Sequence, residues 1–389
     1  YNGANTWTQL GQDIDGEGTR DESGVVSLSS DGSIVAIGAR YNGGNGTFSG
    51  HVRVYQYNDT WTQLGQDIDG ESFDQSGMSV SLSYNNDDEI IVAIGAPYNS
   101  GNGSSSGHVR VYQYDVNKTT SITDQSSIDF GPVGWRRLGL DIDGEAAYDN
   151  SGSSVSLSSD GYTVAIGASG HVRVYQLNGS SWEQLGGYID GEAAYDQSGS
   201  SVSLSGDGTI VAIGARYNDG NGDMPGHVRV YQLNGSSWEQ LGGDIDGEAA
   251  GDQSGSSVSL SSDGYTVAIG ASGHVRVYQL NGSSWEQLGG YIDGEAAYDQ
   301  SGSSVSLSGD GTIVAIGARY NDGNGDMPGH VRVYQLNGSS WEQLGGDIDG
   351  EAASDRSGLS VSLSSDGYTV AIGDPFNDGT GSDSGTCKV

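Results

Sequence analysis

Short apolar runs alternate with polar turn residues along the whole chain, and each run is too short to form a helix. In one copy the runs cover residues 201–205, 211–215, 227–232 and 238–243. Tight turns rich in Gly, Asp, Asn and Ser separate them, such as Asp207-Gly208. Runs of this length that are rich in β-branched residues and bounded by such turns favour strands. The pattern therefore predicts four strands, which we call A to D, in every copy.

The copies repeat a fixed order of motifs. W-x-x-L-G, I-D-G-E, D-x-S-G, S-L-S and V-A-I-G follow one another seven times, and G-H-V-R-V-Y-Q completes six of the copies. The tryptophans are Trp7, Trp61, Trp135, Trp182, Trp238, Trp285 and Trp341, spaced by 54, 74, 47, 56, 47 and 56 residues. Four strands repeated at this period predict a β-propeller in which each repeat forms one blade. Residues 182–284 recur almost unchanged from residue 285, so two blades were duplicated together.

The two ends of the chain fit into one blade. Tyr1 lies six residues before the first tryptophan, as Tyr55 does before the second, so the chain begins where strand C ordinarily ends. At the other end, Val389 aligns with Val54. The last blade is therefore expected to take three strands from the C-terminus and one from the N-terminus, a closure that leaves no open sheet edge.

These observations predict an all-β protein with a single domain over residues 1–389. Its fold class is a seven-bladed β-propeller of four-stranded antiparallel blades. Residues 1–14 complete the blade formed by residues 357–389, and an insertion at about residues 115–134 interrupts blade two. Because the sequence starts inside a repeat, any leader or neighbouring domain is expected to lie outside it.

The repeat also carries a family resemblance. The run S-G-x-S-V-S-L-S-x-D-G-x-x-V-A-I-G-A, spelled once as Ile94-Gly95-Ala96-Pro97, resembles the FG-GAP repeat of integrin α-subunit propellers. The W-x-Q-L-G-x-D-I frame is similar to the FG-GAP repeat type of bacteria and algae. The resemblance covers nearly the whole chain and implies a secreted or cell-surface propeller used in adhesion or recognition. Serine replaces the phenylalanine of the FG pair in Ser198-Gly199 and Ser301-Gly302, and the A–B turn is too short for the family's calcium loop.

Charge narrows the range of partners. The chain has 51 acidic residues against 15 lysines and arginines, a formal net charge of −36. Such a surface repels nucleic acid and anionic lipid head groups, so neither is expected as a partner. No stretch of 18 apolar residues could span a membrane, so membrane insertion of this segment is not expected.

Strand direction sorts the loops onto two faces. The A–B and C–D turns share one face, whereas the B–C loops and the D–A connections share the other. Asn-x-Ser/Thr sequons, which favour an extracellular glycoprotein, occur at Asn45, Asn58, Asn102, Asn117, Asn178, Asn234, Asn281 and Asn337. Most of them, and the insertion of blade two, are assigned to the first face. A partner is therefore expected on the face of the B–C loops and D–A connections.

Each D–A connection is acidic and reads D-I-D-G-E followed by a further Asp. Oxygen ligands at alternate positions, with a glycine to turn the backbone, suit Ca²⁺. The alternative is structural: carboxylates cap nearby backbone N–H groups while the intervening Ile fills the core. In the connections that lead into blades four and six the first acid is replaced by Tyr188 and Tyr291. The candidate metal ligands are Asp13, Asp15, Glu17, Asp21, Asp67, Asp69, Glu71, Asp74, Asp141, Asp143, Glu145, Asp149, Asp244, Asp246, Glu248, Asp252, Asp347, Asp349, Glu351 and Asp355.

Two other residue sets recur with the blade. The histidines His51, His108, His171, His227, His274 and His330 each precede V-R-V-Y. On strand C, His, Arg and Tyr alternate with the valines, so they are expected to share one strand face and to pair with neighbouring acids rather than to share a metal. Candidate ligand loops carry an aromatic ring beside polar residues: Arg40, Tyr41, Tyr98, Arg216, Tyr217, Arg319, Tyr320 and Phe376. These rings either stack on sugars or pack their own loops.

No catalytic motif stands out from the repeat. The sequence lacks a nucleophile elbow, a phosphate loop and zinc-ligand spacing, so we do not expect an enzyme, and no cofactor other than Ca²⁺ is expected. Cys387 is interpreted as the replacement of the strand-C arginine in blade seven, either as a buried thiol or as a link to sequence beyond Val389. The function expected is an extracellular or cell-surface adhesion or scaffold propeller that binds a protein or copies of itself. The alternative is a multivalent lectin-like propeller for polysaccharide.

Overall fold

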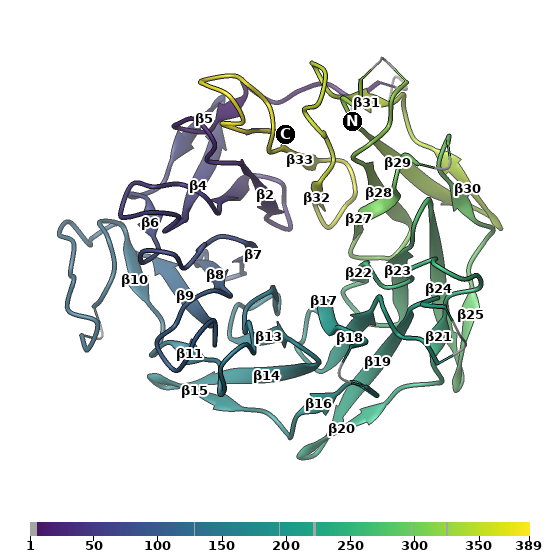
Figure 1. Cartoon of the computed structure of the whole chain (residues 1–389), viewed down its shortest axis with the longest axis horizontal. Coiled ribbons are helices and arrows are strands. Elements are labelled where there is room, and N and C mark those ends of the chain that lie inside the picture. Colours follow the sequence, from purple (N-terminus) through teal and green to yellow (C-terminus); the bar gives the residue numbers. More distant parts are fainter. Residues whose placement is uncertain (1–5, 128, 194, 221–222, 297, 324–325) are drawn as a thin grey trace.

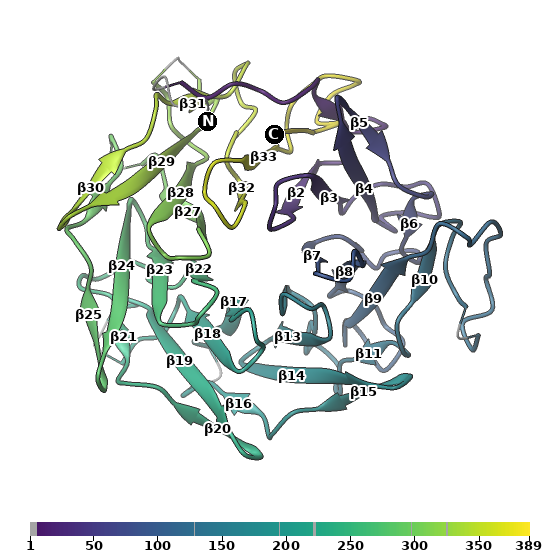
Figure 2. The same cartoon turned by 180° about the vertical axis from the view of Figure 1, so that it is seen from behind.

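Seven antiparallel sheets stand around a central axis and close into a ring in the computed structural model (Figure 1). The structure describes residues 6–389 except 128, 194, 221–222, 297 and 324–325, and no helix occurs in that part of the chain. Seen from behind, the N- and C-terminal segments lie side by side in the same sector of the ring (Figure 2). The predicted fold class, a seven-bladed β-propeller, is thereby confirmed.

The strands of each blade follow one another along the chain from the central axis outwards. Blade one contains β2 (Ser23–Leu28), β3 (Ile34–Ala39), β4 (His51–Asn58), β5 (Thr60–Gln63) and β6 (Ile68–Asp69). Blade two contains β7 (Ser79–Tyr84), β8 (Ile90–Ala96), β9 (His108–Tyr114), β10 (Trp135–Arg137) and β11 (Ile142–Asp143). Blade three contains β12 (Ser154–Leu157), β13 (Thr163–Ala168), β14 (His171–Asn178), β15 (Ser181–Gln184) and β16 (Ile189–Asp190).

The remaining blades repeat this plan. Blade four contains β17 (Ser198–Leu204), β18 (Ile210–Ala215), β19 (His227–Asn234), β20 (Ser237–Gln240) and β21 (Ile245–Asp246). Blade five contains β22 (Ser257–Leu260), β23 (Thr266–Gly270), β24 (His274–Asn281), β25 (Ser284–Gln287) and β26 (Ile292–Asp293). Blade six contains β27 (Ser301–Leu307), β28 (Ile313–Ala318), β29 (His330–Asn337), β30 (Ser340–Gln343) and β31 (Ile348–Asp349). Blade seven contains β32 (Ser360–Leu363), β33 (Val370–Asp374), β34 (Thr386–Lys388) and β1 (Ile14–Asp15).

The I-D pair of each D–A connection forms a short extra strand that the sequence pattern did not predict. In blade one Ile68 pairs with Val52 and Asp69 with His51, so β6 continues the outer edge of the blade beside β4. Ile68 is 2% exposed and enters the core, as the structural interpretation of the connection expected. Two residues are too few to show a strand period in sequence. This pairing fixes the acidic connection against strand C and so positions the candidate site.

The closure of the ring joins the two ends of the chain. Ile14 of β1 pairs with Cys387 of β34, and the Leu10 N–H donates to the Val389 carbonyl at 2.7 Å. The equivalent bond inside blade one runs from Leu64 to Val54 at 2.8 Å. The N-terminal segment therefore occupies the place of a fourth strand, in agreement with the predicted closure.

Two rings of hydrogen bonds link each blade to the next. Near the axis, a strand-A serine accepts the N–H of a strand-A leucine in the next blade, as from Leu204 to Ser156 at 2.9 Å; the bond from Leu28 to Ser362 at 2.9 Å closes this ring between blades seven and one. At the periphery, each tryptophan indole donates to the carbonyl of the leucine in the preceding W-x-x-L-G, as from Trp238 to Leu185 at 2.8 Å. The W-x-x-L-G motif therefore supplies both the indole donor and the leucine carbonyl acceptor of this outer ring.

The apolar core lies between adjacent blades. One cluster combines Val172, Val174 and Ile189 of blade three with Val211 and Ile213 of blade four, all nearly inaccessible to solvent. Strand B of each blade is buried along its whole length, as expected for a strand covered on both faces. Because each blade covers its neighbour, the scaffold that carries the loops is rigid.

Candidate functional site

The B–C loops and the D–A connections form one continuous rim on the same face. The Phe73 N–H of a connection donates to the Thr47 carbonyl of the preceding B–C loop at 2.8 Å, and the equivalent bond from Tyr148 to Ser104 is also 2.8 Å. Asn42, which is 6% exposed, donates its amide to Asp21 at 2.9 Å and accepts the Gly44 N–H at 2.7 Å. These bonds tie each long B–C loop to the acidic connections on either side of it.

The last acid of each connection caps the backbone. Asp21 accepts the Gly18 N–H at 2.9 Å, Asp74 accepts the Glu71 N–H at 3.2 Å, and Asp149 accepts the Ala146 N–H at 2.8 Å. Asp252 and Asp355 make the same contact with their own connections. These carboxylates are used in local turns, as the structural interpretation of the acidic connection described.

The strand-C arginines of three blades bridge two connections. Arg229 donates to both oxygens of Asp244 at 2.9 Å and also contacts Glu192. Arg332 pairs with Asp347 and Glu295 in the same way, and Arg110 contacts Glu71 at 2.7 Å and Asp141 at 2.9 Å. A buried or half-buried guanidinium thus neutralises two carboxylates in blades two, four and six. The predicted pairing of strand-C arginines with neighbouring acids is what these contacts show.

The two blades with collapsed B–C loops use a second arrangement. In blade three, Arg173 turns toward the Asp143 carbonyl at 3.1 Å and the Glu145 carboxylate at 3.2 Å. Tyr188 replaces the first acid and packs its ring edge on His171, with ring centroids 5.4 Å apart. Tyr291 and His274 repeat this contact in blade five at 5.3 Å. The first acid is therefore absent where no arginine would pair with it.

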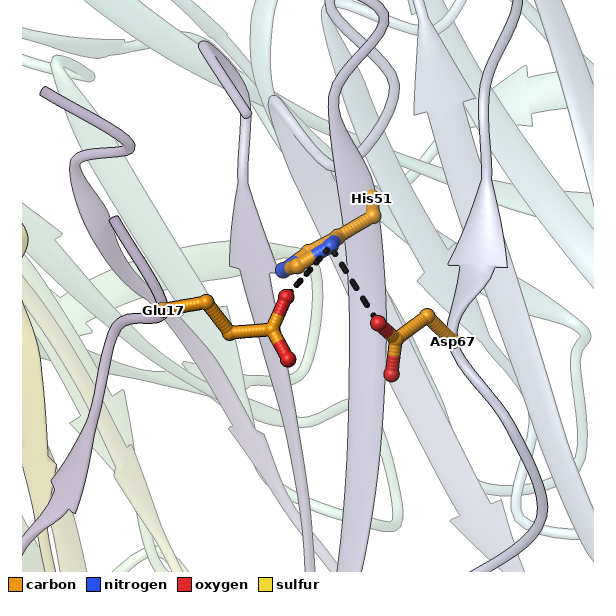
Figure 3. Close-up of side chains that lie close together, drawn as sticks. All are labelled: Glu17, His51 and Asp67. Carbon is orange, nitrogen blue, oxygen red and sulfur yellow. Dashed lines mark ion pairs between the residues drawn. The ribbon is translucent and has the colours of Figure 1, made fainter. Parts of the chain in front are cut away.

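Blade one combines features of both arrangements and leaves two carboxylates facing a buried histidine (Figure 3). Arg53 turns away, donating to the Asp15 carbonyl at 2.7 Å, although the first acid, Asp67, is retained. His51 lies between Glu17 and Asp67, and its Nδ1 is 3.9 Å from an oxygen of each. The His51 side chain is 1% exposed, and its Nε2 is buried without a hydrogen-bond partner within the described residues. Blades four and six contain clusters of the same composition. In those blades, however, Arg229 and Arg332 pair with the carboxylates.

The pKa directions follow this difference in charge pairing. A hydrogen bond from Arg229 lowers the pKa of Glu192 below its usual value. In blade one, burial and then repulsion by Asp67 raise the pKa of Glu17 instead. Burial and the same carboxylates raise the pKa of Asp69 to about 6. Burial and then Arg53 lower the pKa of His51 to about 4, so its imidazole is neutral at pH 7.

Blade seven departs from the repeat at the end of the chain. Cys387 pairs with Ile14 and so takes the place of Val52, while Lys388 takes the place of the strand-C arginine. The interpretation of Cys387 as the arginine replacement is therefore wrong, because the strand register places it one residue earlier. Lys388 contacts Glu351 at 3.3 Å and Asp374 at 3.2 Å. The Cys387 thiol is fully buried, and burial raises its pKa.

The insertion of blade two runs between β9 and β10 along the outer edge of the ring, where Figure 1 shows it projecting beside β10. The sequence pattern predicts that the whole insertion lies on the face of the A–B and C–D turns, but only its base lies there. Gln125 reaches the Glu71 carboxylate at 2.7 Å, and Ser121 reaches Gln66 at 3.3 Å. A cavity of about 810 Å³ lies between the insertion and the connection, with Asp67 and Arg110 in its lining.

The aromatic rings of the predicted ligand loops are covered by arginines. Arg40 lies over Tyr41 at 4.8 Å, Arg216 over Tyr217 at 4.9 Å, and Arg319 over Tyr320 at 5.0 Å. Phe376 is covered by Arg356 at 4.3 Å, whereas Tyr98 is 41% exposed. A guanidinium over the ring occupies the face that a sugar would need. All eight sequon asparagines are exposed.

Sequence reasoning missed a set of exposed aromatics on the connections. Phe73, Tyr148, Tyr195 and Tyr298 each precede the capping Asp and are 61%, 70%, 89% and 88% exposed. Phe73 and Tyr148 hold left-handed backbone angles, with φ of 71° and 70°. A bulky residue at such an angle is strained, by about 1–3 kcal/mol. The signal is present in the sequence as an aromatic directly before the capping Asp in four connections.

Comparison with known proteins agrees with the propeller fold and finds FG-GAP repeats in two segments of the chain. The ring of seven antiparallel sheets is a β-propeller, and a solved structure of a putative 6-phosphogluconolactonase from Bacteroides uniformis ATCC 8492 shares this fold. That structure aligns with a TM-score of 0.60 at 13% identity and covers 87% of this chain and 88% of its own. The FG-GAP repeat family matches residues 190–231 and 293–334, and together with the seven-bladed fold this match supports an FG-GAP repeat β-propeller. No curated protein sequence matches the chain. The described part of the chain also has no helix long and apolar enough to cross a membrane.

Proposed function

We propose that the protein is an extracellular adhesion or scaffold propeller whose B–C and D–A loop face binds a protein partner or further copies of the chain. The observation that carries this proposal is the set of exposed aromatics on the connections, Phe73, Tyr148, Tyr195 and Tyr298. Exposed aromatic side chains on a rigid frame are the usual anchors of protein interfaces. FG-GAP propellers support a role in protein interaction in general.

Backbone strain adds a second argument. Phe48, Met224 and Met327 in the B–C loops are also 48%, 48% and 44% exposed and hold φ of 50°, 56° and 59°. Phe48 makes an edge contact with Tyr41 at 5.5 Å, but nearly half of its side chain stays exposed, and backbone strain of this kind is common at functional sites. We infer that a partner covers these side chains.

The opposite face offers fewer features of this kind. Tyr265 and Tyr368 on its A–B turns are 41% and 42% exposed, and the Asn234 sequon lies on its C–D turns. Exposed sequons on that face agree with an extracellular location, although Asn45 and Asn102 place two further sequons on the loop face. Binding of polysaccharide through Tyr217 and Tyr320 is not proposed, because an arginine lies over each ring.

The experiment compares two double variants of the intact chain. Phe73→Ser with Tyr148→Ser removes two anchors of the loop face, and Tyr265→Ser with Tyr368→Ser removes two exposed aromatics from the opposite face. Self-association is measured by sedimentation over a concentration series, and binding is measured on panels of extracellular-matrix and cell-surface proteins. We expect the first variant to lose at least tenfold in affinity and the second to match the parent. Equal losses in both variants, or unchanged binding in the first, would contradict the proposal.

A further inference from the structure

The structure assigns a divalent transition-metal site to blade one, formed by Glu17, His51 and Asp67 (Figure 3). The ligand atoms are His51 Nδ1 and one oxygen of each carboxylate, which all lie within 4.8 Å of one another. This set differs from the calcium interpretation of the acidic connections, because its central ligand is an imidazole nitrogen.

The distances match an ion rather than a hydrogen bond. His51 Nδ1 is 3.9 Å from Glu17 Oε2 and 3.9 Å from Asp67 Oδ2, which is too long for direct hydrogen bonds. An ion between these atoms would lie about 2.0–2.5 Å from each of them, close to the Zn–N and Zn–O distances of about 2.0–2.2 Å. Small movements of the two flexible carboxylates complete the fit.

The buried histidine is the independent observation. His51 is 1% exposed, its Nε2 is buried without a hydrogen-bond partner within the described residues, and Figure 3 shows ion pairs from one ring nitrogen to both carboxylates. The other ring nitrogen, Nδ1, faces Glu17 and Asp67, so Nδ1 is the atom that a metal would bind. The backbone of β4 and its pairing with β6 fix the position of the ring.

Blade one is singled out by the orientation of its arginine. In blades four and six, Arg229 and Arg332 pair with both carboxylates and occupy the place of a cation. In blade one, Arg53 donates to the Asp15 carbonyl instead, and its guanidinium is 3.9 Å from Glu17. In blade one, therefore, no arginine bridges the two carboxylates beside the histidine, whereas in blades four and six an arginine already neutralises both.

The identity of the metal follows from the ligand types. One imidazole nitrogen and two carboxylate oxygens suit Zn²⁺ and its neighbours among divalent first-row metals, whereas Ca²⁺ and Mg²⁺ prefer oxygen ligands alone. Glu17 is 48% exposed and Asp67 29% exposed, so water completes the coordination and the ion enters from solvent. Asp67 also lines the cavity under the blade-two insertion, which gives the ion a route to the site.

The test is calorimetric titration of chelator-treated full-length protein with ZnCl₂, in parallel with CaCl₂. We expect one Zn²⁺ per chain and at least tenfold weaker binding of Ca²⁺. Asp67→Asn should weaken Zn²⁺ binding at least tenfold, whereas the matched control Asp244→Asn should leave it unchanged. Asp67 is partly exposed, and thermal melting without metal checks that both variants fold.

A gain-of-function variant tests the role of the arginine separately. Arg229→Met removes the cation from the Glu192, His227 and Asp244 cluster and should raise the Zn²⁺ stoichiometry from one to two. The inference is overturned if Zn²⁺ does not bind, if Asp67→Asn binds it as tightly as the parent, or if Ca²⁺ binds as tightly as Zn²⁺. A stoichiometry that stays at one in Arg229→Met would overturn the role given to the arginine.

Discussion

The contact between each tryptophan and the glycine of the preceding blade can be tested by one substitution, Gly186→Ala. Gly186 has φ of 66°, and a Cβ built on it would lie 2.8 Å from Trp238 Cδ1. Gly179 has φ of 63° with no atom within 4 Å of such a Cβ, so Gly179→Ala carries the backbone cost without the contact. Gly187 has open space as well, so Gly187→Ala controls for the side chain alone.

The magnitudes separate the three variants. An alanine in left-handed conformation costs about 1–2 kcal/mol, which both Gly179→Ala and Gly186→Ala include. In Gly186→Ala, overpacking against the indole adds about 1–3 kcal/mol. Displacement of the indole also weakens its 2.8 Å hydrogen bond to the Leu185 carbonyl, at about 1 kcal/mol. We therefore expect Gly186→Ala to be about 2–4 kcal/mol less stable than Gly179→Ala.

The assay is equilibrium unfolding in guanidinium chloride followed by circular dichroism, with the free energy of unfolding compared among the variants. The duplicated blades supply an internal repeat. A Cβ built on Gly289 would lie 2.8 Å from Trp341 Cδ1, whereas a Cβ on Gly282 would have no atom within 4 Å. If Gly186→Ala and Gly179→Ala have the same stability within about 0.5 kcal/mol, the indole does not pack on that glycine and the outer ring of contacts is refuted.

Three further results are expected. Burial raises the pKa of Asp374 to about 6, above its unfolded value, so its contribution to stability is full below pH 4 and is lost as pH rises through 6. When the pH falls from 7 to 4, the free energy of unfolding of the wild type, measured in urea, should therefore rise by about 2–3 kcal/mol relative to that of Asp374→Asn. The same pH dependence in both proteins would refute this. Ser156→Ala removes the acceptor of the Leu204 N–H in the inner ring, so amide exchange at Leu204 should speed up by at least tenfold while Ser180→Ala, an exposed control, has no effect. Deletion of residues 1–15 should expose the buried Cys387 to a thiol reagent in native buffer, and a thiol that stays unreactive would contradict closure by the N-terminal strand.

Both the number of blades and their closure followed from the sequence alone. The seven W-x-x-L-G frames fix the repeat, and the alignment of Val389 with Val54 places both termini in one blade. These features are visible because strand period and turn chemistry are local properties of the chain. The burial of Ile68 and the backbone cap made by Asp21 could also be predicted from the sequence, because both features depend on the local motif.

The differences among blades were decided by the tertiary structure. His-Val-Arg is identical in blades one, four and six, yet Arg53 turns toward the Asp15 carbonyl while Arg229 pairs with Asp244. The orientation of such a side chain depends on the connections that precede and follow its strand, which lie many residues away. A repeated motif therefore gives the same prediction in every blade, whereas only the ring sets the surroundings that leave His51 facing two carboxylates that no arginine bridges.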